Sequence, residues 1–145
     1  MTNTPIPTAR FLLMVSIVAS VVGLTSNADL RAASSGPLDG RTFIGESGPA
    51  GKQGDTKETI VFRDGRFRSL ACDPYGFGDA FYTATAEADG SIRFEAETAS
   101  KRQGTMHWEG VIRGDQLDGT LVWKPRNNIA KNYWVRASQK QQRSN

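Results

Sequence analysis

The sequence has one cysteine and one histidine, Cys72 and His107, among 145 residues. A single cysteine excludes a disulfide within the chain. The fold must therefore be stabilised by its core, or by pairing between chains. One Cys and one His also cannot form a tetrahedral zinc site without two carboxylates. We accordingly predict neither a metal nor a cofactor.

A hydrophobic run long enough to span a membrane is also missing. The apolar stretch at residues 11–24 is shorter than the roughly 20 residues that a spanning helix needs. It follows Arg10 and precedes Ser26-Asn27-Ala28, which is the plan of a secretory signal peptide. We predict cleavage after Ala28, with Ala32 or Ala33 as the alternative position, a periplasmic or secreted protein, and no stable membrane span after cleavage. The rival interpretation of this stretch is a membrane anchor.

An excess of charge of one sign is absent too. The 18 basic residues stand against 15 acidic ones and give a net charge of +3. The two signs alternate along the chain, as in Arg63-Asp64 and Arg113-Gly-Asp115, which is typical of a solvated surface. Because the numbers of basic and acidic residues are nearly equal, we predict no nucleic-acid partner.

Helical periodicity is almost absent after residue 40, and alternation of apolar and polar residues replaces it. In residues 92–97, for example, Ile92, Phe94 and Ala96 share one face, and charged residues share the other. Asp64-Gly65 and Asp89-Gly90 join such segments as hairpin turns do. The strand candidates are residues 42–44, 58–63, 66–72, 80–87, 91–97, 104–112, 116–123 and 132–137.

This pattern predicts an all-β fold, a small antiparallel up-and-down meander barrel of about eight strands after a cleaved N-terminal signal helix. Closure into a barrel removes the exposed edges of a flat sheet. A two-sheet sandwich is the alternative. The predicted divisions are a signal peptide at 1–28, a linker at 29–40, the barrel domain at 41–137 and a disordered tail at 138–145.

Several segments carry a resemblance to known proteins. They are residues 38–46, 62–69, 72–78, 82–85 and 94–97, of which Cys72-Asp-Pro-Tyr-Gly-Phe-Gly78 is the most distinctive. With these segments the chain resembles a group of small exported bacterial proteins of uncharacterised function. The resemblance implies a lipocalin- or avidin-like (calycin-like) barrel. It implies no catalytic residues, and the biotin-binding set of avidins has no counterpart in this sequence.

Cys72 is the reactive-thiol candidate. A nucleophilic thiol needs a base or a positive field, and Arg66 and Arg68 precede it on the same predicted strand. The alternatives are a small residue packed where a loop meets the barrel, and a disulfide between chains.

The predicted ligand-binding residues are aromatic: Trp108, Trp123, Tyr82, Tyr75 and Phe77. Large flat rings inside a barrel can stack on a ligand, and they can equally fill the barrel's own core. Tyr75 and Phe77 lie in the Gly-rich segment 73–79, which is expected either to plug one end of the barrel or to gate it. The Gly-rich segment 45–57 is expected to be a mobile loop at the open end.

No pattern in the sequence supports catalysis. The pair Glu95 and Glu97 falls on an outward strand face, and no Ser-His-Asp arrangement surrounds His107. We therefore predict a protein that is not an enzyme and that binds a small apolar ligand or an envelope protein at the open end of the barrel. The alternatives are an inhibitor-like or envelope-associated interaction module without a cavity, and a thiol-dependent activity at Cys72.

Overall fold

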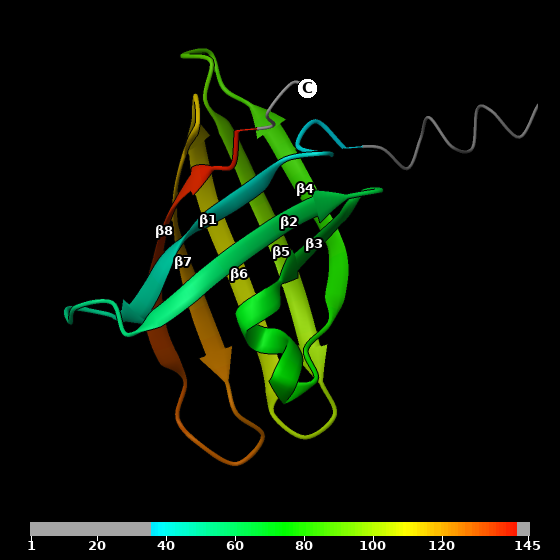
Figure 1. The fold of residues 1–145 in the computed structure, drawn as a ribbon. Helices are drawn as coiled ribbons and strands as arrows, with labels where there is room; N and C mark the ends of the chain where they lie inside the picture. Colours follow the sequence, from blue (N-terminus) through cyan, green and yellow to red (C-terminus); the bar gives the residue numbers. More distant parts are fainter. Residues whose placement is uncertain (1–35, 142–145) are drawn as a thin grey trace, which may run out of the picture.

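Eight antiparallel strands form a closed barrel in the computed structural model, which describes residues 36–141 (Figure 1). The elements are β1 (Thr42–Pro49), β2 (Thr56–Arg63), β3 (Arg66–Ser69), the 3₁₀-helix η1 (Leu70–Tyr75), β4 (Asp79–Ala86), β5 (Ile92–Ser100), β6 (Gly104–Arg113), β7 (Gln116–Lys124) and β8 (Lys131–Gln139). Each strand pairs with the next, and β8 closes on β1. The predicted all-β meander barrel is confirmed. The predicted signal peptide lies outside the described residues.

Tight turns set the register between neighbouring strands. Asp64 and Gly65 both adopt positive φ, 53° and 72°, and they connect β2 to β3 with Phe62 opposite Phe67. A two-residue turn of this kind needs left-handed backbone at both positions, which Asp and Gly tolerate. Asp64-Gly65 therefore forms the hairpin turn that the sequence predicts.

Alternation along the strands separates the core from the surface. On β5, Phe94 and Ala96 are buried, whereas Arg93, Glu95 and Glu97 are exposed. Neighbouring side chains point to opposite faces of a strand, so one face of β5 lines the barrel interior and the other meets solvent.

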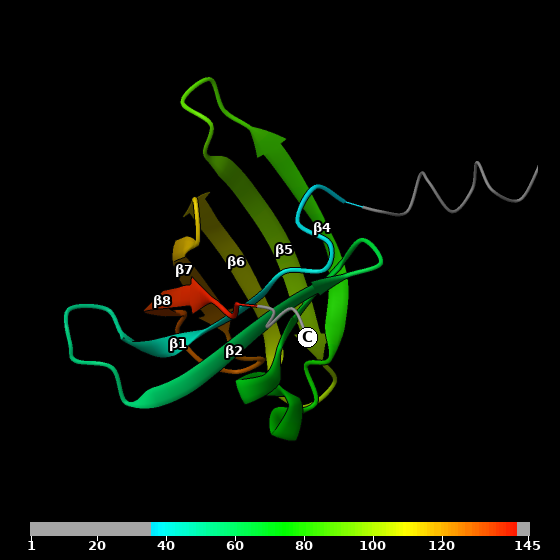
Figure 2. The same cartoon turned by 45° about the horizontal axis from the view of Figure 1, so that its top comes forward.

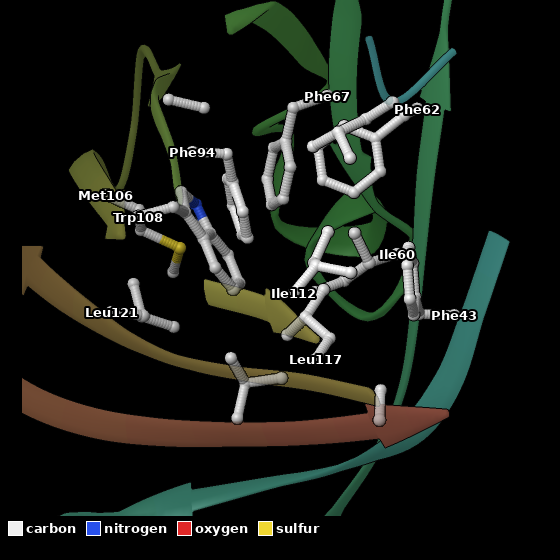
Figure 3. Close-up of a cluster of buried hydrophobic side chains, with 14 of the residues drawn as sticks. Phe43, Ile60, Phe62, Phe67, Phe94, Met106, Trp108, Ile112, Leu117 and Leu121 are labelled. Atoms are coloured by element: carbon white, nitrogen blue, oxygen red, sulfur yellow. The ribbon is translucent and has the colours of Figure 1, made fainter. Parts of the chain in front are cut away.

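Phe62 lies at the centre of an aromatic cluster that fills one half of the barrel (Figure 3). Its ring centroid lies 6.1 Å from Phe43, 5.6 Å from Phe67, 5.0 Å from Tyr82 and 5.1 Å from Phe94, each in an edge-to-face arrangement. Aromatic pairs favour this geometry. The half of the interior around Phe62 is therefore a packed core.

The segment before β1 covers this filled end of the barrel. Leu38 is fully buried, and Asp39 accepts hydrogen bonds from the Tyr82 hydroxyl at 2.8 Å and from the Gly65 N–H at 2.9 Å. The Tyr82 oxygen in turn accepts from the Leu38 N–H at 3.1 Å. Residues 36–40 thus pack on the barrel, although the sequence assigns them to a linker. At the other terminus, β8 continues to Gln139, into the segment assigned to the tail.

The sequence predicts that the third strand continues to Cys72, and this prediction is wrong. β3 ends at Ser69, and η1 carries the chain through residues 70–75 instead. Pro74 lies inside η1 and has no N–H to donate to a strand ladder. The loop expected at 45–57 is also shorter than predicted, since β1 extends to Pro49 and β2 begins at Thr56.

The helix η1 lies at the end of the barrel opposite residues 36–41. The β5–β6 turn and the β7–β8 loop lie at this same end (Figures 1 and 2). The Ser100 hydroxyl, at the end of β5, donates a 2.8 Å hydrogen bond to the Tyr75 carbonyl and fixes η1 to the opposite wall. We refer to this part of the molecule as the η1 end.

Candidate binding cavity

A cavity of about 380 Å³ occupies the interior at the η1 end. This volume lies in the lower part of the roughly 300–1,000 Å³ range of small-molecule sites. An eight-stranded barrel is just wide enough either to be filled by side chains or to hold one small ligand. In this protein the aromatic cluster fills one half of the barrel. The half at the η1 end keeps a hollow beside buried side chains such as Phe77 and Leu121.

The walls of the cavity are mainly apolar, with a few polar groups among them. The apolar and aromatic lining consists of Ala71, Tyr75, Phe77, Met106, Leu121, Trp123 and Tyr133. The polar lining consists of Ser47, Thr56, Glu58, Cys72 and Gln103. A mostly apolar surface with a few convergent polar groups is the usual composition of a ligand pocket.

Small side chains on neighbouring elements create the space. Ser47 on β1 and Ala71 on η1 line the cavity where the filled half has large rings such as Phe43 and Phe62. On β6, Trp108 packs in the core, and Met106, two residues before it, faces the cavity. On β1 the inward side chain thus changes from Phe43 in the filled half to Ser47 at the η1 end.

Glu58 is the charged residue of the cavity lining. It lies on the same face of β2 as Ile60 and Phe62, and only 2% of its surface is exposed. Its Oε1 accepts hydrogen bonds from the Ser69 hydroxyl and from the Thr59 N–H, both at 2.9 Å. Burial raises the pKa of the Glu58 carboxyl, and these hydrogen bonds oppose the shift.

Cys72 is buried beside Glu58 at the same end of the barrel. Its Sγ lies 3.6 Å from the Sδ of Met106, in the geometry of a thiol donating to a thioether. Burial raises the pKa of the Cys72 thiol to about 11, and the carboxylates of Glu58 and Asp73 act in the same direction. A thiol in this environment holds little thiolate at neutral pH, and thiolate is the reactive form.

The structure separates the predicted ligand-binding residues into two groups. Trp123, Tyr75 and Phe77 line the cavity together. Trp108 is buried in the filled half, where its Nε1 donates to the Thr98 hydroxyl at 3.2 Å. Tyr82 bonds to the segment that covers the opposite end. Tyr75 lies at the rim of the hollow and is 55% exposed, whereas Phe77 is 3% exposed and packs in the core beside the hollow.

Sequence reasoning missed Glu58. The signal was present, because Glu58, Ile60 and Phe62 occupy alternate positions of one strand and must share a face. A carboxylate in phase with buried apolar residues either has a partner or has a function. A hydrogen bond from the backbone of Ala71 also lowers the pKa of Glu58. This partner could not be found from the sequence, because it lies on η1, which replaces the last residues of the predicted strand.

A larger hollow, of about 630 Å³, lies on the outer surface beside the β1–β2 loop. It is lined by Glu46, Lys52, Trp134 and Arg136 together with the backbone of residues 51–54. The Trp134 Nε1 donates to the Lys52 carbonyl, and the Arg136 guanidinium lies 5.2 Å from the ring centroid of Trp134. This hollow is open to solvent and its one aromatic ring is already engaged, so we favour the interior cavity as the site.

His107 lies on the outer wall, where its Nε2 is 2.9 Å from the Glu109 carboxylate. Across residues 36–141, no three His, Cys, Asp or Glu side chains are placed to hold a metal ion. In the same residues no helix has the length and apolar character needed to cross a bilayer.

Three comparisons were made with known proteins. No protein-family model, no curated protein and no solved structure matches this chain.

Proposed function

We propose that this protein is an exported binding protein that holds a small apolar ligand in the cavity at the η1 end. The single observation that carries the proposal is the half-filled barrel. A core optimised for stability alone would have no hollow of about 380 Å³, because a void loses packing contacts and destabilises the fold. The export part of the proposal rests on the signal-peptide pattern of residues 1–28.

Binding rather than catalysis is the activity that the site supports. The cavity holds one carboxyl group and one thiol, and burial raises the pKa of that thiol to about 11. His107 faces outward and cannot act as a base toward the cavity. The sequence resemblance to calycin-like barrels agrees with a ligand carrier, since small barrels of that kind enclose one small ligand.

The experiment is titration with N-phenyl-1-naphthylamine, a neutral apolar dye that fluoresces in apolar surroundings. We expect saturable fluorescence with wild-type protein and its loss in Ala71→Phe, because the added ring would occupy the hollow. Ala88→Phe is the matched control, since Ala88 is exposed in the β4–β5 connection at the opposite end. It should bind the dye as the wild type does.

Equal dye binding by wild type and Ala71→Phe would contradict the proposal. The same is true of a wild type that binds no dye. Either result would favour an interaction module that uses the outer surface and loops of the barrel.

A further inference from the structure

Glu58 is an unusual residue to find on the inner face of a barrel. Its side chain is almost fully buried, and the Ile60 and Phe62 side chains occupy the next two inward positions of β2. Within residues 36–141, no Lys, Arg or His forms an ion pair with it. A buried carboxylate without a cation is costly unless hydrogen bonds or a ligand compensate it.

The hydrogen bonds to Glu58 leave part of its capacity unused. It accepts from the Ser69 hydroxyl, from the Thr59 N–H and from the Ala71 N–H. An ionised carboxylate has about four acceptor sites, so three bonds leave room for one more. Glu58 also lines the cavity, and a ligand there can reach this group.

The charge around the cavity favours a positive ligand. Among its described lining residues, Glu58 is the one acidic or basic side chain. The nearby Asp73 is paired with Arg68 at 2.8 Å, so Glu58 is the group in the cavity that can offer a negative charge. A cationic group beside Glu58 would supply the missing counter-charge in a place where water screens it little.

The aromatic walls suit the same kind of ligand. Trp123, Tyr133 and Tyr75 bring three electron-rich rings to the η1 end. Such rings attract ammonium groups through the faces of their π systems. The Trp123 ring already lies against the Lys131 Nζ, 5.2 Å from its centroid, so Tyr75 and Tyr133 are the rings that remain for a ligand cation. Met106 and Leu121 offer an apolar surface for the rest of the ligand.

We infer that the cavity binds a small organic amine, with an ammonium group on the Glu58 carboxylate and an apolar or aromatic body against Met106, Leu121 and Trp123. This inference rests on the proposed binding function and narrows its ligand class. The alternative role for Glu58 is purely structural, since its bonds to Ser69 and Ala71 also tie β2 to η1.

The test is isothermal titration with 2-phenylethylamine and with its neutral isostere 2-phenylethanol. We expect wild type to bind the amine at least about tenfold more tightly, because both compounds can donate a hydrogen bond to Glu58 but only the ammonium group adds a positive charge. Glu58→Gln keeps the shape of the side chain and removes the charge. It should bind the two compounds with similar affinity. The control Glu95→Gln removes a charge from the exposed face of β5 and should keep the preference.

A purely structural Glu58 would change the affinity for both compounds by the same factor, and that result would overturn the inference. Equal binding of the two compounds by wild type would overturn it as well, while leaving the cavity as a binding site. Binding of neither compound, together with failure of the dye titration, would instead remove the proposed function itself.

A second measurement covers the case in which Glu58→Gln does not fold. The amine preference of wild type should fall as the pH is lowered and the Glu58 carboxylate takes up a proton, because a neutral carboxyl offers no counter-charge. The other titratable groups facing the cavity are Cys72, Tyr75 and Tyr133. Asp73, paired with Arg68, and Lys131, beside Trp123, lie nearby. Burial raises the pKa of the Cys72 thiol to about 11, so this group stays neutral as the pH falls. A preference that is unchanged down to about pH 4, near the ordinary pKa of a Glu side chain, would contradict the inference.

Discussion

Leu117 and Leu121 offer a matched test of the half-filled barrel. Both lie on β7 and point inward, and their exposed fractions are 1% and 6%. Leu117 packs beside Ile112 in the filled half (Figure 3). Leu121 lines the cavity. Truncation to Ala removes the same atoms at both positions, so any difference in cost reports on the surrounding packing.

The expected costs follow from two contributions. Loss of three buried carbon groups at ~0.8 kcal/mol each amounts to about 2.4 kcal/mol for either variant. At position 117 the truncation also opens a closed void, and a residual volume of ~50 Å³ at ~24 cal/mol per Å³ adds about 1.2 kcal/mol. At position 121 the new space joins an existing hollow, and this second contribution is small. We therefore expect Leu117→Ala to lose about 3.6 kcal/mol and Leu121→Ala about 2.4 kcal/mol.

Urea unfolding followed by tryptophan fluorescence and circular dichroism measures both variants. With a slope of ~2 kcal/mol per molar urea, the difference places the midpoint of Leu117→Ala about 0.6 M below that of Leu121→Ala. Equal costs, or a larger cost at Leu121, would mean that the two halves are packed alike and would refute the reasoning.

Three further predictions concern side chains at the two ends of the barrel. Tyr82→Phe should lower the free energy of unfolding by about 1.5–3 kcal/mol at neutral pH, because the hydroxyl bonds to the Asp39 carboxylate. Burial raises the pKa of Tyr82 to about 12 from 10.0, so this advantage of wild type should persist to about pH 10 and disappear as the pH rises through 12; equal urea midpoints for the two proteins at neutral pH would contradict it. Burial also raises the pKa of Cys72 from 9.0 to about 11, so labelling of the native thiol by Ellman's reagent at neutral pH should be at least ~100-fold slower than in urea; comparable rates would show that the thiol is accessible. Burial raises the pKa of Glu58, so its neutral form is favoured by folding, and wild type should lose stability relative to Glu58→Gln as the pH rises from below 4.5 through the raised pKa; parallel stability profiles in urea would show that Glu58 has no such shift.

The sequence predicts the strands and several turns of this fold, because both depend on local rules. Alternation on β5 places Phe94 and Ala96 inside, and Asp64-Gly65 adopts the positive φ values that the hairpin needs. These features follow from the two-residue period of a strand and from the steric freedom of two turn residues. Because the connections between consecutive strands are short, each strand pairs with the next one and the eight strands form a meander.

The cavity could be predicted only in part, because it depends on packing between distant residues. Alternation alone assigns Trp108 and Trp123 to the interior, but it does not show that Trp108 packs in the core and that Trp123 lines a hollow. The place of Cys72 depends on η1, where the chain leaves the strand geometry before Pro74. The hydrogen bond from Tyr82 to Asp39 joins residues that lie 43 positions apart.

The most direct test of the central claim is the methyl resonance of Met106 in protein labelled with ¹³C at the methionine methyl groups. Met106 lines the cavity, and the other two methionines, Met1 and Met14, lie in the predicted signal peptide. Addition of 2-phenylethanol should shift the Met106 methyl signal in a saturable way in wild type, and Ala71→Phe should abolish the shift. A Met106 signal that stays unchanged at all concentrations of 2-phenylethanol would contradict ligand binding in the barrel.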